Sequence, residues 1–117
     1  MQDEGKVFAT RLKAARTRKA LKLGFQTSRG YSQEQLGVDA GIDELSASAR
    51  INQYEQGKHV PDVGTAIRLA AALEVPLAYL FCPEPDLAEL LLLAYDMNRG
   101  KRTALLEAAR DLTDSDV

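Results

Sequence analysis

The sequence predicts an all-α protein, with a five-helix domain (residues 1–82) followed by a C-terminal helical hairpin (residues 83–117). Three observations support this fold class. Apolar residues recur at the three- to four-residue spacing of amphipathic helices along most of the chain. Alanine and leucine are abundant, whereas aromatic residues make up 6% of the chain and tryptophan is absent, which favours helices over sheets. No segment carries a convincing strand pattern.

Hydrophobic spacing predicts a first helix from Lys6 to Lys19. Its apolar residues recur on one face, at Val7, Phe8, Leu12 and Ala15. The segment from Ala20 to Gly30 is ambiguous, because residues 20–23 extend the helical pattern whereas Gly24 and Gly30 are typical of a loop.

Ser32 predicts the start of a second helix, because serine is a good N-cap residue and Gln35 follows three positions later, as in a capping box. This helix covers residues 33–39 or 33–40, and Gly41 can end it in a left-handed conformation.

A third helix is expected to begin at Asp43 or Ser46, either of which can cap it, and to run to about Gln56, where Gly57 stops it. Its inward face carries Ala47, Ile51 and Tyr54.

Proline residues punctuate the rest of the domain. Pro61-Asp62 opens a fourth helix, and Pro76 opens a short fifth helix from Leu77 to Phe81. The fourth helix turns an apolar face inward, made of Ala66, Leu69, Ala70 and Leu73.

Beyond a break at Pro83 and Pro85, two further helices are predicted, from about Asp86 to Asn98 and from Lys101 to Leu112, with the hairpin turn at Gly100. Residues 87–97 are apolar almost all round, which indicates burial on more than one side. We therefore expect a homodimer through this segment, although a tighter monomeric core is an alternative. The expected interface residues are Leu87, Leu90, Leu91, Ala94, Leu105 and Leu112.

Composition narrows the function. The net charge is −2, yet eight Lys and Arg residues and no Asp or Glu lie between Gly5 and Tyr31. Cys82 and His59 are the only residues of their types, so neither a disulfide within the chain nor the usual zinc ligand set is expected. The apolar run Leu90–Tyr95 is too short for a membrane span, and the charged N-terminal helix does not resemble a signal peptide. We expect a cytoplasmic, nucleoid-associated protein.

The stretch from Tyr31 to Phe81 resembles the Cro/cI-type, or Xre-like, helix-turn-helix family, a large group of bacterial and phage repressors. The matching segments, in the family's order, are Ser32–Leu36, Ala40–Ile42, Ile51–Lys58, Pro61, Leu69–Leu73 and Leu80–Phe81. The resemblance covers roughly residues 6–81 and implies a lambda-repressor-like domain that binds double-stranded DNA. An α-helix fits the major groove, where each base pair presents a distinct pattern of donors and acceptors.

The resemblance also implies roles for individual residues. Base-facing positions match Ser48, Ala49, Asn52 and Gln53, and Ser46 lies on the same outer side. Arg50 would lie near a base or a phosphate, and Gln33, Lys58 and His59 would contact the DNA backbone, with Gln33 also near a base. Arg16 and Glu55 match a buried structural ion pair.

Three of these residues also fit roles that involve no DNA contact. Gln33 is also compatible with a plain surface position, His59 with an ordinary loop residue, and Arg50 with a surface ion pair to Asp43 or Glu44.

Two departures from the family spacing are visible. About ten additional residues lie at roughly 20–29, where Lys22 and Arg29 could form a basic loop that touches DNA. About four more lie between Gly41 and Gly57, which predicts either a recognition helix longer by one turn or a longer turn.

These observations predict a transcriptional regulator that binds a palindromic operator as a homodimer, with repression the commoner habit of the family. The alternative is an antitoxin or partner-binding module that represses its own operon and holds a protein through its acidic, leucine-rich C-terminus. We expect no cofactor and no enzymatic activity, because no catalytic arrangement is visible and Cys82, between Phe81 and Pro83, resembles an apolar filler.

Overall fold

The computed structural model describes residues 4–115, which form six α-helices, two short 3-10 helices and no strand. The predicted all-α fold class is confirmed. In chain order, the elements are α1 (Glu4–Lys22), η1 (Ser28–Gly30), α2 (Gln33–Asp39), α3 (Glu44–Glu55), α4 (Val63–Leu73), η2 (Leu77–Phe81), α5 (Pro85–Asp96) and α6 (Arg99–Ser115). None of these helices combines the length and apolarity needed to span a bilayer.

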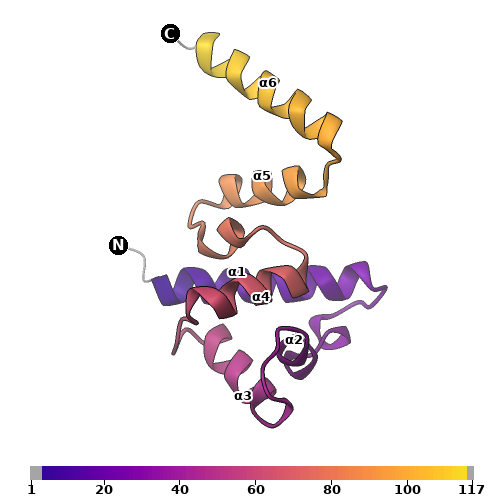
Figure 1. Cartoon of the computed structure of the whole chain (residues 1–117), viewed down its shortest axis with the longest axis vertical. Coiled ribbons are helices and arrows are strands. Elements are labelled where there is room, and N and C mark those ends of the chain that lie inside the picture. The colour runs from indigo at the N-terminus through magenta and orange to yellow at the C-terminus, as the bar shows by residue number, and fades with distance from the viewer. Residues whose placement is uncertain (1–3, 116–117) are drawn as a thin grey trace.

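Helix α1 crosses the middle of the molecule, with α2 and α3 on one side and α5 and α6 on the other (Figure 1). The largest fully buried side chains come from α1, α2, α3, α4 and η2, so these elements share a single core. These side chains are Phe8, Leu12, Leu36, Ile51, Leu69, Leu73 and Leu80. The Phe8 ring meets the edge of Tyr54 at a centroid distance of 6.3 Å, which joins α1 to α3.

The ambiguous segment after the first helix is resolved into a helical part and a short loop. Helix α1 continues to Lys22, and Gly24 follows it with a φ of +95°, a conformation that glycine adopts without strain. The ring of Phe25 then lies directly over Gly30, where a Cβ atom would come within 2.1 Å of Phe25 Cγ. The extra residues of this region therefore add a turn to α1 and form a closed loop.

Local capping chemistry sets the bounds of α2 and α3. Ser32 Oγ accepts a hydrogen bond from the Gln35 backbone N–H at 3.0 Å, and Gly41 has a φ of +83°. Asp43, rather than Ser46, caps α3, since its Oδ1 accepts from the Leu45 N–H. The connection from α2 to α3 covers only residues 40–43, an ordinary helix-turn-helix length. The extra residues of this region therefore lengthen α3 and not the turn.

Helices α2 and α3 approach each other closely at Gly37 and Ala47. A Cβ atom built on Gly37 would lie 2.6 Å from Ala47 Cβ and 2.9 Å from its Cα, so the two backbones meet where no side chain intervenes. This contact fixes how α3 sits relative to α2.

We expect Gly37→Ala to lower the free energy of unfolding by about 1–3 kcal/mol, because the added methyl group forces the two helices apart. Chemical denaturation measures this change. Gly100→Ala is the matched control, since its added Cβ would meet only Asn98 Oδ1, at 3.5 Å, and alanine favours the helix. Equal stability of the two variants would contradict the close contact.

The two C-terminal helices follow one another as predicted, but the turn between them lies at residues 97–98 and not at Gly100, and the hairpin is splayed open. Gly100 lies within α6, and Asn98 Oδ1 caps that helix by accepting from the Lys101 N–H at 2.9 Å. The Arg102 guanidinium donates to the carbonyl oxygens of Ala94 and Tyr95, which ties the start of α6 to the end of α5. As a result, α6 projects away from the body and does not pack along α5 (Figure 1).

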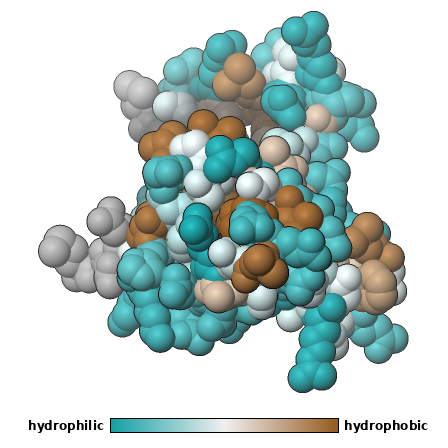
Figure 2. Space-filling model, turned by 60° about the horizontal axis from the view of Figure 1, so that its bottom comes forward, coloured by the Kyte–Doolittle hydropathy of each residue, from teal (hydrophilic) through white to brown (hydrophobic). Residues whose placement is uncertain are grey.

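An apolar groove of about 890 Å³ opens between α5 and α6. It is lined by five of the six residues expected in a dimer interface, namely Leu87, Leu90, Leu91, Ala94 and Leu105. Leu112, the sixth, lies further along α6 and is 71% exposed. Figure 2 shows the brown, apolar atoms of this recess behind the rest of the molecule.

Candidate nucleic-acid interface

Helix α3 has one buried side and one exposed side. Ala47, Ile51, Tyr54 and Glu55 are buried against the rest of the domain. Ser48, Ala49, Arg50 and Gln53 are exposed, and Ser46 and Asn52 are half-buried at the edges. Ser48 and Ala49 are short, so this side of the helix can approach another surface closely.

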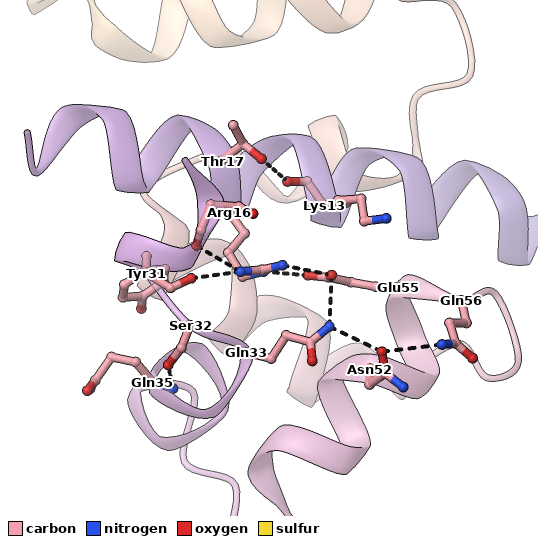
Figure 3. Close-up of polar contacts among 11 residues, drawn as sticks. Lys13, Arg16, Thr17, Tyr31, Ser32, Gln33, Gln35, Asn52, Glu55 and Gln56 are labelled. Atoms are coloured by element: carbon pink, nitrogen blue, oxygen red, sulfur yellow. Dashed lines mark hydrogen bonds and ion pairs between the residues drawn. The ribbon is translucent and has the colours of Figure 1, made fainter. Parts of the chain in front are cut away.

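A buried ion pair anchors α3 to α1 (Figure 3). Arg16 Nε donates to Glu55 Oε2 at 2.7 Å, and a second guanidinium nitrogen donates to Oε1 at 3.1 Å. The remaining terminal nitrogen of Arg16 donates to the carbonyl oxygens of Ser28 and Tyr31, so the guanidinium also fixes the segment that leads into α2. The structure thus contains the ion pair implied by the family resemblance, and three elements meet at it.

Side-chain amides extend the hydrogen-bond network from Glu55 toward the surface. Gln33 Nε2 donates to Glu55 Oε1 at 3.1 Å and to Asn52 Oδ1 at 3.3 Å, and Gln56 Nε2 donates to the same oxygen of Asn52 at 3.4 Å (Figure 3). Because both bonds end on Oδ1, the NH₂ group of Asn52 remains free to donate to a ligand. Gln33 is half-buried and acts first as a bridge between α2 and α3.

Tyr31 fixes the approach to α2 from the other side. Its hydroxyl donates to Asp39 Oδ2 at 2.6 Å, and Lys19 lies over its ring at 5.7 Å. Burial and the bond to Asp39 raise the pKa of the Tyr31 hydroxyl well above its usual value, so it stays a neutral donor. The short α2 is therefore held at both its ends.

The loop after α3 carries Lys58 and His59, both exposed. Arg50 forms no ion pair with Asp43 or Glu44 in the described part of the chain. It lies near Asp62, the N-cap of α4. The hydrogen bond from the Thr65 N–H, and then the nearby Arg68 and Arg50, lower the pKa of the Asp62 carboxyl. The guanidinium of Arg50 remains exposed beside the outer side of α3.

Much of the positive charge of α1 is paired within the molecule. Arg18 meets Asp96 at 2.6 Å, Lys19 meets Glu74 at 2.6 Å, and Lys22 reaches Asp96 at 3.5 Å. Three of the eight cations in the basic N-terminal stretch therefore hold α1 to the ends of α4 and α5. Lys22, which the sequence suggested for a basic DNA-touching loop, is part of this arrangement, whereas Arg29 is exposed.

Two residues of α3 and its C-terminal end escaped the sequence interpretation. Gln56 is exposed and lies four positions after Asn52, a spacing that places both on one side of the helix. Leu45, in the first turn, is 94% exposed.

The fold and the exposed side of α3 define a helix-turn-helix protein. A family model described as "Helix-turn-helix" matches residues 26–80. The crystal structure of the transcriptional regulator BswR is similar over 92% of this chain and 96% of that chain, with a TM-score of 0.76 and 43% sequence identity. The comparison with curated proteins found no match. The chain belongs to the Cro/cI-type helix-turn-helix family.

Proposed function

We propose that this protein is a transcriptional regulator that inserts α3 into the major groove of double-stranded DNA, and that it represses transcription from a palindromic operator as a homodimer. The observation that carries the proposal is the exposed polar side of α3, held in place by the buried chain from Arg16 through Glu55 to Asn52. A reading helix must be rigid, because base discrimination depends on donors and acceptors in fixed positions. The likeness to the transcriptional regulator BswR supports a role in transcriptional regulation.

The roles of the exposed residues follow from their chemistry. Gln53 can pair with adenine through both the oxygen and the NH₂ of its side-chain amide, and Asn52 can donate through its free NH₂ group. Arg50 can reach guanine or a phosphate from the edge of the helix, while Lys58 and His59 can contact the DNA backbone from the following loop. Ser46, Ser48 and Ala49 complete the side that faces the bases.

The exposed leucines of α5 and α6 support the proposed dimer. Leu87 is 46% exposed and Leu90 is 48% exposed, and both line the open groove between the two helices. Contiguous apolar surface of this kind on a soluble protein marks an interaction site. A two-fold dimer would place two recognition helices about 34 Å apart, one turn of DNA, on a palindromic site.

Selection of bound sequences from random duplexes should yield a site with two inverted half-sites. Gln53→Ala should then weaken binding to that site by about 1–3 kcal/mol and relax the base preference at one position of each half-site. Titrations of selected and random duplexes measure both effects.

Lys58→Ala is the matched comparison, since it removes an exposed cation just beyond α3. It should weaken binding to all sequences alike and reduce the salt dependence, as loss of a phosphate contact does. Absence of any binding to duplex DNA at low ionic strength would contradict the proposed function. A Gln53→Ala variant with unchanged sequence preference would remove Gln53 from the reading side.

A further inference from the structure

Leu45 is exposed to an unusual degree for its size. Of the large hydrophobic side chains on the described surface, it has the greatest exposure at 94%, compared with 71% for Leu112 and 70% for Val63. It lies in the first turn of α3, two residues after the Asp43 cap. The cap uses the backbone N–H of Leu45 and not its side chain, so it does not require a leucine.

The position of Leu45 on the helix aligns it with the proposed reading side. Ser48, Ala49 and Asn52 follow it at three, four and seven positions, a spacing that places all four on one side of α3. The buried residues Ala47, Ile51 and Tyr54 occupy the opposite side. Figure 2 shows the underside of the molecule, where isolated brown groups interrupt a mainly hydrophilic surface.

The charges around Leu45 indicate which part of DNA this turn can meet. Asp43 and Glu44 are both exposed at the start of α3, and their carboxylates would repel a phosphate. The turn is therefore suited to the base edges and not to the backbone. Leucine offers no hydrogen bond, and the apolar group that bases present in the major groove is the 5-methyl group of thymine.

We propose that Leu45 contacts a thymine methyl group and fixes a thymine preference in each half-site, beyond the positions read by Ser48 and Asn52. This inference rests on the proposed function and extends it. The small side chains of Ser48 and Ala49 let the helix approach the groove closely, and the additional N-terminal turn of α3 carries Leu45 to the next base step. The lengthened recognition helix thus reads one more position by shape and apolar contact.

Replacement of thymine by deoxyuracil tests the proposal, because it removes only the methyl group. In the selected operator, we expect a single thymine per half-site whose replacement weakens binding of the unaltered protein about fourfold per half-site, the factor for one methyl group removed from an apolar contact. Leu45→Ala should lose at least the same factor on the thymine operator and should bind the thymine and uracil operators equally. Leu23→Ala, which truncates a leucine that is 53% exposed outside α3, should behave like the unaltered protein.

Several results would overturn the inference. The first is that no uracil replacement changes the affinity of the unaltered protein for the operator. The second is that Leu45→Ala still binds the uracil operator more weakly than the thymine operator. The third is that Leu45→Ala changes only self-association. Failure of the unaltered protein to bind any duplex would remove the proposed function as well, so the two failures are distinguishable. Circular dichroism confirms that Leu45→Ala retains its helices.

Discussion

Glu55→Ala should lower the free energy of unfolding by about 3–5 kcal/mol, the range expected when one partner of a buried ion pair is removed. The side chains of Arg16 and Glu55 are only 8% and 2% exposed. Without the carboxylate, the Arg16 guanidinium keeps its bonds to two backbone carbonyl oxygens but has no charge partner in a poorly solvated site. Gln33 also loses its nearer acceptor, so α2 and α3 loosen together. Urea denaturation followed by circular dichroism measures the loss.

Two further variants show whether Glu55→Ala loses stability because Arg16 is left as an unpaired buried charge or because an ion pair as such is lost. Replacing both partners by apolar residues, Arg16→Met with Glu55→Leu, should recover much of the lost stability, because no uncompensated charge remains. Asp96→Ala removes a carboxylate that pairs with Arg18 but is 48% exposed, and it should cost less than about 1 kcal/mol. A Glu55→Ala variant no less stable than Asp96→Ala would show that the pair contributes little.

The bounds of the central helices could be predicted because the signals are local. Ser32 with Gln35, and the glycines at 41 and 57, act within one turn of the chain, and each occupies the predicted position in the structure. The choice between Asp43 and Ser46 as the cap of α3 could not be made in this way, since both are good N-cap residues. That choice decided whether the extra residues belonged to the turn or to the helix.

The uncertain choice of N-cap also explains why the sequence analysis did not single out Leu45. With a helix that begins at Ser46, Leu45 belongs to the turn and its exposure has no consequence. With Asp43 as the cap, Leu45 is a helical residue on the exposed side of α3. Gln56 was overlooked for a related reason, because it lies at the boundary of the helix, where the periodic pattern ends.

Charge and tertiary arrangement were the least predictable features. The cations of α1 look like a nucleic-acid surface in the sequence, but Arg18 and Lys19 meet carboxylates 78 and 55 residues away. The opening angle of the C-terminal hairpin could not be predicted, because it depends on the Asn98 cap and on Arg102, which no hydrophobic period records. The hydrophobic periodicity did identify the residues that line the groove. Contact with a partner and burial in a core both require apolar side chains, so the same pattern marks either.

The largest effect on DNA binding is expected from loss of the proposed dimer. Leu90→Asp combined with Leu105→Asp places two carboxylates in the apolar groove between α5 and α6. We expect light scattering to show a dimer for the unaltered protein at micromolar concentration and a monomer for this variant. Affinity for the full operator should then fall by about 10²–10⁴, because the second half-site is no longer bound at a high effective concentration. Affinity for a single half-site should stay the same.

Leu23→Asp is the matched control, because it places a carboxylate outside the groove at a leucine of similar exposure. Leu23 is 53% exposed and Leu90 is 48% exposed. It should remain a dimer and bind the operator normally. An unaltered protein that is monomeric, and that binds half-sites and full operators equally well, would contradict the homodimer. The apolar groove would then be available to a different protein, because an exposed apolar patch of this size marks an interaction site even on a monomer. Co-purification of a small basic partner would in that case favour the antitoxin function over a free-standing repressor.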